Sequence, residues 1–136
     1  MFNYLKLYSI SVVIFFAIDL IWLGLVAKGF YQKYLGFILR EQPHWPVAIG
    51  FYLIYVAGMV YFVIEPAISA ESWRKACVAG AIFGFVTYAT YDLTNHATLK
   101  DWPWQVTIAD ICWGTCLGCF VSTASYFANR MVGLGT

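Results

Sequence analysis

Long apolar runs alternate with short polar segments along the whole chain. The apolar runs cover residues 5–27, 47–64, 76–95 and 104–127, and the polar segments between them contain all four prolines. Each run is close to the ~20 residues that a helix needs to cross about 30 Å of hydrocarbon. Strand alternation is absent, and isolated strands cannot span a membrane. The pattern therefore predicts an all-α integral membrane bundle of four transmembrane helices with short loops, forming one domain over residues 1–136.

Composition agrees with a lipid environment. The chain is 62% hydrophobic and 11% charged, with a mean hydropathy of +0.71. Soluble domains usually carry about 25% charged residues, so this chain has too little polar surface to coat a water-soluble globule. The net charge of +1 gives no sign of a nucleic-acid partner. Membrane lipids are the first partners that we expect.

The basic residues do not reveal how the bundle is oriented in the membrane. Cytoplasmic loops usually hold an excess of Lys and Arg. With four alternating spans, the eight basic residues divide equally between the two sides: Lys6, Arg74, Lys75 and Arg130 on one, and Lys28, Lys33, Arg40 and Lys100 on the other. The orientation stays open.

Three aspartates lie in or at the ends of the apolar runs: Asp19, Asp92 and Asp110. Such residues are expensive in hydrocarbon and usually face a bundle interior. Alternating spans place all three in the same half of the membrane. At ~1.5 Å per residue, Asp19 lies about 12 Å inside its helix end and Asp110 about 9 Å. Asp92 is shallower, so one interpretation is that it simply reaches interfacial water.

Helical spacing predicts which faces pack together. Gly114 and Gly118 form a small-xxx-small pair on the stripe that carries Asp110, and Gly80 and Gly84 form a similar pair in the third run. Such pairs let two helix backbones approach closely in a membrane. We therefore predict that the third and fourth helices pack through these glycines, with Asp92 and Asp110 at the mouth of their contact and Asp19 facing them.

Aromatic and polar side chains accompany the aspartates. Trp102 and Trp104 are typical of an interface belt, whereas Tyr52 and Tyr55 read as internal. A carboxylate surrounded by aromatic rings can hold a lipophilic cation by charge pairing and cation–π contacts. The same arrangement also fits a flat apolar ligand or a lipid headgroup, and it singles out none of the three. The candidate ligand-binding residues are Asp19, Trp22, Tyr88, Tyr91, Asp92, Asn95, His96, Asp110 and Trp113.

Four cysteines raise the question of a metal site. Cys112, Cys116 and Cys119 follow one stripe of the fourth run, and Cys77 lies in the third. No Cys-x-x-Cys pair in a loop supports zinc. We interpret the cysteines as small apolar side chains that pack between helices, predict no metal site, and identify no cofactor.

Three motifs resemble a known family. They are Asp19-x-x-Trp22, Asp110-x-x-Trp113-Gly114, and a longer run with Tyr91-Asp92-Leu93-Thr94-Asn95, Ala97-Thr98-Leu99-Lys100 and Trp102-Pro103. With these motifs the chain resembles small bacterial four-helix membrane proteins that are grouped as a domain of unknown function. The resemblance covers essentially the whole chain. It implies the four-helix topology, a bacterial inner-membrane location and the candidate site, but no reaction.

Three functions remain open. The first is binding or transport of a small lipophilic or cationic ligand at an acidic, aromatic-lined site in one leaflet. The second is a membrane-embedded enzyme that acts on a lipid or isoprenoid by carboxylate acid–base chemistry. The third is a non-catalytic scaffold subunit in which the aspartates only lock helices together. The glycine faces also leave a homodimer open as an alternative to a monomer.

Overall fold

The computed structural model describes residues 4–133 and contains four helices long and apolar enough to cross a membrane. They run over Tyr4–Leu35, Trp45–Ser69, Trp73–Thr98 and Trp104–Gly133. No strand forms anywhere in residues 4–133. The predicted all-α bundle of four transmembrane helices is confirmed.

Each of the first two spans contains a π-helical turn. The first consists of α1 (Tyr4–Trp22), η1 (Leu23–Ala27) and α2 (Lys28–Leu35). The second consists of α3 (Trp45–Met59), η2 (Val60–Ile64) and α4 (Glu65–Ser69). A π turn closes i→i+5 hydrogen bonds, so it changes which face the following residues present, and such turns are frequent at functional sites.

The last two spans are the single helices α5 (Trp73–Thr98) and α6 (Trp104–Gly133). Ser72 caps the start of α5, since its side chain accepts a hydrogen bond from the Lys75 amide at 3.1 Å. It ends at Leu99, where the backbone becomes extended, and Asp101 in the following turn has a φ of 60°.

The observed helices are longer than the apolar runs. The largest difference concerns the predicted connection from Lys28 to Pro46, which is helical through Leu35. Polar residues extend a helix beyond the hydrocarbon at little cost, because the interface supplies water. The apolar runs thus mark the membrane-embedded parts and not the helix ends.

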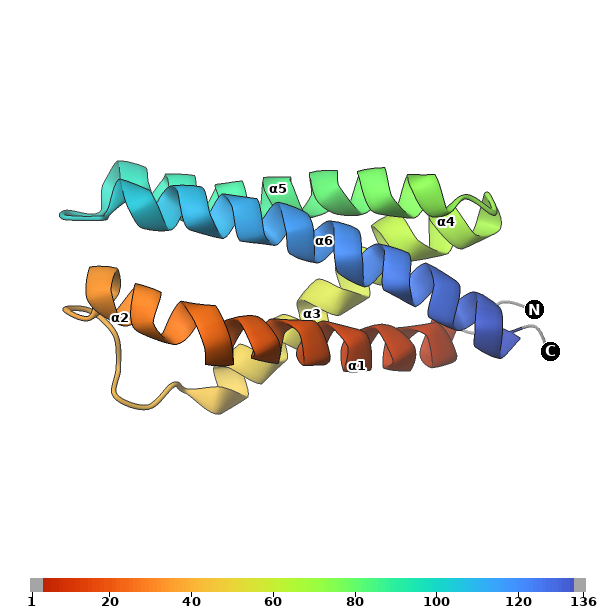
Figure 1. Cartoon of the computed structure of the whole chain (residues 1–136), viewed down its shortest axis with the longest axis horizontal. Helices are drawn as coiled ribbons and strands as arrows, with labels where there is room; N and C mark the ends of the chain where they lie inside the picture. Colours follow the sequence, from red (N-terminus) through yellow and green to blue (C-terminus); the bar gives the residue numbers. More distant parts are fainter. Residues whose placement is uncertain (1–3, 134–136) are drawn as a thin grey trace.

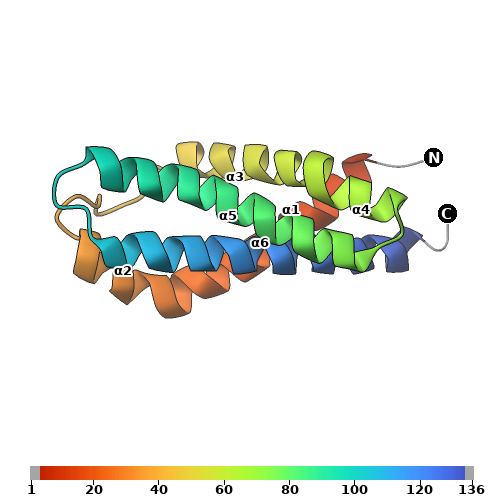
Figure 2. The ribbon, with the colours of Figure 1, turned by 90° about the horizontal axis from the view of Figure 1, so that it is seen from above.

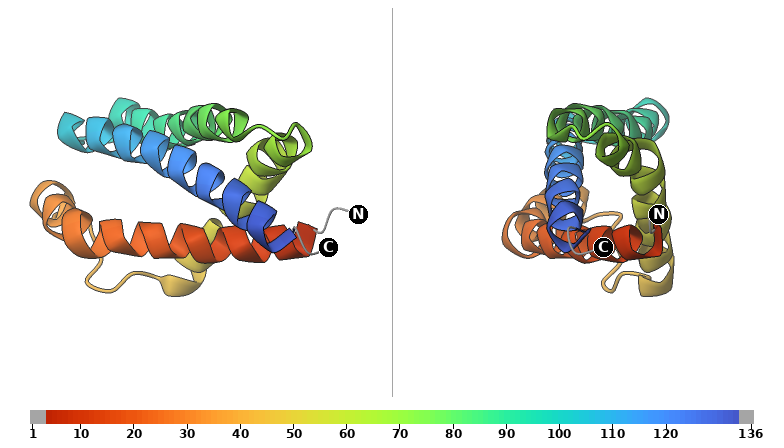
Figure 3. Two further views of the ribbon diagram at one scale, coloured as in Figure 1. Left: turned by 45° about the vertical axis from the view of Figure 1, so that its right-hand side comes forward. Right: turned by 90° about the vertical axis from the view of Figure 1, so that its right-hand side faces the viewer.

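The four spans surround the middle of the bundle like the sides of a rectangle (Figure 3, right). Helix α6 begins beside α5 and approaches α1 toward its own end, whereas α3 begins near α1 and leads to α4 beside α5 (Figure 1). The fourth span (α6) and the second span (α3 to α4) thus connect the two sides of the bundle at one end. At the other end, α1 and α2 diverge from α5 and α6 (Figure 1), whereas in the view from above α2 and α6 overlap (Figure 2).

Helices α5 and α6 pack through glycines. A Cβ atom on Gly84 would overlap the carbonyl group of Gly114, and one on Gly118 would overlap the carbonyl of Gly80. The backbones therefore touch where both helices lack side chains, as the two glycine pairs predict. Gly114 also leaves room for the ring of Tyr88, which a Cβ would meet.

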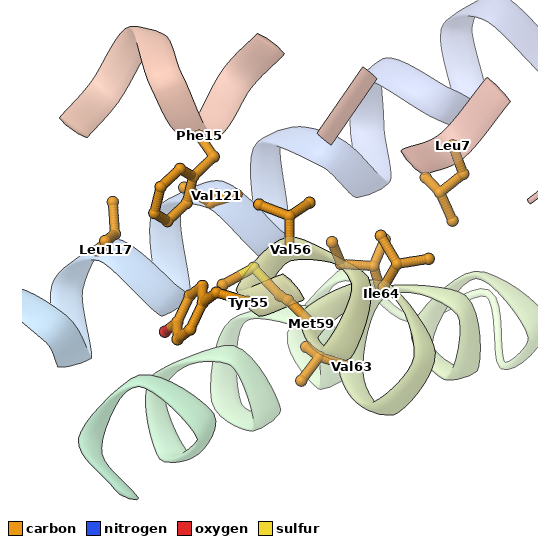
Figure 4. Close-up of a cluster of buried hydrophobic side chains, with 10 residues drawn as sticks. Leu7, Phe15, Tyr55, Val56, Met59, Val63, Ile64, Leu117 and Val121 are labelled. Atoms are coloured by element: carbon orange, nitrogen blue, oxygen red, sulfur yellow. The ribbon is translucent and has the colours of Figure 1, made fainter. Parts of the chain in front are cut away.

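A hydrophobic core fills the middle of the bundle, between α1, α6 and the second span (Figure 4). Its buried members are Leu7, Phe15, Tyr55, Val56, Met59, Val60, Val63, Ile64, Leu117 and Val121. Phe15 lies one helical turn before Asp19, on the same buried stripe of α1. The core therefore separates two halves of the bundle. One half contains the aspartates, and the other contains the start of α1 at Tyr4 and the end of α6 at Gly133.

Candidate functional site

A cavity of about 920 Å³ occupies the diverging end of the bundle. Residues from α1, η1, α2, α3, α5 and α6 line it, and nine of the seventeen lining residues are aromatic. Asp19 and Asp110 are the only charged side chains in the lining, which contains no Lys, Arg or His. A smaller hollow of about 380 Å³ at the opposite end is lined by Tyr4, Tyr8, Tyr61 and three aliphatic residues. Since this smaller hollow holds no group for chemistry, the large cavity is the candidate site.

The cavity reaches the protein surface. Two of its lining residues, Phe51 on α3 and Tyr91 on α5, are 54% and 60% exposed. Leu39, in the connection after α2, is also exposed. These exposed lining residues show that the cavity is open between α3 and α5 and beside the connection after α2.

Asp19 lies in the wall that α1 contributes. Only 5% of it is exposed, and its polar neighbours are the Trp113 indole and the Tyr52 hydroxyl. The Nε1 atom of Trp113 is buried and has no hydrogen-bond partner in the structure. The site therefore combines a nearly buried carboxyl group with a buried indole N–H donor next to it.

Asp110 lies in the wall that α6 contributes, with 7% of it exposed. The Tyr31 hydroxyl on α2 donates a hydrogen bond to Asp110 Oδ1. This bond links the first span to the fourth at the end of the bundle where the two spans diverge.

Asp92 is a neighbour of Asp110 but does not line the cavity. It is fully buried, and neither of its carboxyl oxygens has a hydrogen-bond partner. The interpretation that Asp92 reaches interfacial water is therefore wrong. Helix α5 continues to Thr98, so Asp92 lies more than a helical turn inside the helix end.

Six of the nine candidate residues line the cavity: Asp19, Trp22, Tyr88, Tyr91, Asp110 and Trp113. The other three, Asp92, Asn95 and His96, do not. His96 is exposed, and its Nδ1 atom lies 3.1 Å from Thr107 Oγ1. Thr107 in turn accepts a hydrogen bond from Trp102 Nε1 at 3.0 Å. His96 thus belongs to a network that fixes a wall residue and does not face the cavity itself.

Trp102 is not the interface residue that the sequence predicts. Only 8% of it is exposed, and it packs with Leu35 and Val106 while lining the cavity. The cause is the length of α2, which brings Leu35 over the turn between α5 and α6. Helix α2, which the apolar pattern does not predict, thus covers Trp102 and removes it from the surface.

Tyr31 is the main site residue that the sequence reasoning missed. The apolar pattern places Tyr31 in the polar segment between the first two runs, where aromatic residues commonly mark the membrane–water interface. A signal was nevertheless present: Phe30, Tyr31 and Tyr34 cluster within one helical turn after Lys28. Tyr52 and Tyr55, which read as internal aromatics, also line the cavity.

The cysteines divide into two groups. Cys77 on α5 and Cys119 on α6 lie between the two helices, with their sulfur atoms 2.7 Å apart. Cys112 and Cys116 are exposed on the outer face of α6. The prediction that the cysteines pack between helices is therefore wrong for these two. None of the four lines the cavity.

The chemical character of the cavity follows from its walls. Aromatic faces carry partial negative charge and attract cations within about 6 Å of the ring centroid. Carboxyl groups in a wall without cationic side chains add a further preference for positive charge. The remaining surface is apolar, which favours a ligand with an apolar body.

The comparisons with known proteins concern the family and not the ligand. The family model described as "Predicted membrane protein (DUF2177)" matches residues 4–127. No curated protein and no solved structure matches the chain. The matched region contains all four apolar runs, the three motifs and every residue that lines the cavity. The chain therefore belongs to the DUF2177 family of predicted membrane proteins.

Proposed function

We propose that this protein binds a small lipophilic organic cation in the cavity between α1, α3, α5 and α6, and carries it within the membrane. The observation that supports the proposal is the lining of the cavity. Nine aromatic side chains accompany two carboxyl groups, and no Lys, Arg or His offsets their charge. A ligand with an apolar body and one positive charge complements both features.

Electrostatics favour a cation over a neutral ligand. Charges interact more strongly in a protein interior than in water, because the effective dielectric constant falls from about 80 to about 20 or less. Asp19 has no cationic partner among its neighbours, which are Tyr52 and Trp113. A bound cation would supply the counter-charge, and the ring of Trp113 or Tyr52 would add a cation–π contact worth about 0.5–2 kcal/mol.

The access route fits a ligand that first dissolves in the bilayer. The exposed lining residues Phe51 and Tyr91 belong to membrane-spanning helices. The core around Phe15 and Leu117 closes the opposite direction. A cavity that is open at one end and sealed at the other is the arrangement that a carrier needs in one of its states.

A binding measurement with tetraphenylphosphonium tests the proposal, because this probe is a permanent cation with an apolar surface. The purified full-length protein in lipid nanodiscs should bind it saturably. Asp19→Asn should weaken binding at least about tenfold, which corresponds to 1.4 kcal/mol. The uncharged analogue tetraphenylsilane should bind wild type and Asp19→Asn alike.

Asp101→Asn is the matched control. It makes the same chemical change at an exposed residue near the same membrane surface, outside the cavity. Asn also tolerates the positive φ of Asp101. An affinity for the cation that is equal in Asp19→Asn, Asp101→Asn and wild type would contradict the proposal. Such a result would favour a role for Asp19 in helix packing alone.

A further inference from the structure

The carboxyl group of Asp92 is the most unusual buried group of the bundle. It is fully buried, and no N–H or O–H donor of the protein reaches either of its oxygens. An isolated carboxylate in such surroundings is so costly that it must be paired or neutralised. Burial without a donor therefore favours a neutral Asp92, or one paired with a positive charge.

The titratable groups that face Asp92 do not include a cation. They are Asp110 from α6, Tyr31 from α2, and Tyr91 from α5 itself. The Tyr31 hydroxyl is already donated to Asp110. Asp92 and Asp110 therefore face each other as two carboxyl groups, an arrangement in which both cannot carry charge without strong repulsion.

Two kinds of positive charge relieve this repulsion, a metal ion or a proton. Hard metal ions take six or more oxygen ligands in the case of Ca²⁺, or an octahedral set in the case of Mg²⁺. Here only two carboxyl groups and the Tyr31 hydroxyl converge. Within the described residues, no group of three or more His, Cys, Asp or Glu side chains could hold a metal ion. A single proton needs only one oxygen of Asp92 as its donor and one oxygen of Asp110 as the acceptor.

We propose that Asp92 and Asp110 form a proton-binding site behind the cavity, in which one proton is shared between the two carboxyl groups. The Asp92 O–H donates to an oxygen of Asp110, while the Tyr31 hydroxyl donates to Asp110 Oδ1. The pair then carries one negative charge, which lies on the Asp110 carboxylate. The hydrogen bonds from Asp92 and Tyr31 fix the position of this carboxylate.

The position of Asp110 couples this site to the cavity. Asp110 is the one member of the pair that lines the cavity, and Tyr31 lines it too. This coupling rests on the proposed binding of a lipophilic cation. When the cation approaches Asp110, the proton held between Asp92 and Asp110 leaves through the cavity to water. Both carboxyl groups are then ionised beside the new positive charge. One positive charge enters and one leaves, so the net charge of the site is unchanged.

Infrared spectroscopy of the ligand-free protein in nanodiscs tests the proton site without any ligand. The C=O stretch of a protonated carboxyl group should be present at neutral pH and should shift in D₂O. It should disappear in Asp92→Asn and persist in Asp101→Asn. Absence of the band from the wild-type protein would overturn the proposal, whatever the variants do. A band that is unchanged in both Asp92→Asn and Asp110→Asn would also overturn it.

Proton counting tests the coupling. Tetraphenylphosphonium is added to the protein in weak buffer with a pH indicator, and bound cation is measured in parallel. We expect about one proton released per bound cation in the wild type and in Asp101→Asn, and none per bound cation in Asp92→Asn. Binding without proton release in the wild type would refute the coupling and leave the proposed function intact. Absence of binding would refute the proposed function, while the infrared band would still decide the proton site.

Discussion

Trp22 on α1 stacks on Trp113 on α6, with ring centroids 4.4 Å apart and an angle of 7° between the planes. Each tryptophan follows an aspartate by three residues, and both aspartates line the cavity. The stack therefore joins the two helices one turn from Asp19 and Asp110, and both of its rings form part of the cavity wall.

Replacement of Trp22 by Ala should remove this link. A stacked aromatic pair contributes about 0.5–1.5 kcal/mol beyond its buried area, so we expect a lower thermal midpoint and several-fold weaker cation binding. Trp22→Phe should recover part of both losses. Trp104→Ala is the control, because Trp104 also lies in a span but is 59% exposed. Equal effects of Trp22→Ala and Trp104→Ala would show that the stack has no special role.

Tyr31→Phe should remove the hydrogen bond to Asp110 and leave the ring in place. A hydrogen bond to a charged group contributes about 1.5–3 kcal/mol in soluble proteins, and interhelical bonds in membranes average about 0.6. We therefore expect a loss of about 1 kcal/mol in the free energy of unfolding, read from reversible denaturation in detergent. Tyr34→Phe on the same helix should cost less, since no hydrogen bond of the Tyr34 hydroxyl is found among residues 4–133. A larger loss in Tyr34→Phe would contradict the assignment.

Gly84→Ala should separate α5 from α6. The added methyl group would overlap the Gly114 carbonyl, and overpacking of this kind costs about 1–3 kcal/mol. Gly50→Ala on α3 is the matched control, because no heavy atom of a neighbouring element lies within 4 Å of its new Cβ. It should be neutral or stabilise the helix by up to about 1 kcal/mol. Similar thermal midpoints for the two variants would contradict the close glycine packing.

Cys77 and Cys119 should be the cysteines that an added oxidant links. Glycine packing brings α5 and α6 so close that the two sulfur atoms lie 2.7 Å apart. After treatment with copper phenanthroline, alkylation and mass spectrometry should find Cys112 and Cys116 alkylated and the other pair protected. Full alkylation of all four cysteines would show that α5 and α6 pack in a different register.

The sequence was sufficient to predict the parts of the site that depend on helical period. An aspartate and a tryptophan three residues apart lie on one face of a helix, so the two Asp-x-x-Trp motifs point their side chains into the same space. The glycine pairs likewise predict the contact between α5 and α6, because only glycine allows that approach. These inferences need no knowledge of where a helix ends.

Inferences that depended on helix ends were wrong. Lys28 and Gly29 interrupt the apolar run and read as the start of a loop, yet the helix continues to Leu35. That extension carries Tyr31 to Asp110 and covers Trp102. The depth of Asp92 was underestimated for the same reason, because α5 extends past the last apolar residue. Hydropathy measures where lipid ends and does not report where helical hydrogen bonding ends.

Locating a bound cation tests the central claim most directly. Tetraphenylarsonium has the shape and charge of the phosphonium probe, and its arsenic atom scatters X-rays anomalously. Crystals of the full-length protein grown from lipid with this cation should show an arsenic peak inside the cavity, between the Asp19 and Asp110 walls. The peak should be absent from crystals of Asp19→Asn grown in the same way. An arsenic peak only on the lipid-facing surface, with the cavity of the wild-type protein empty of arsenic, would contradict the account.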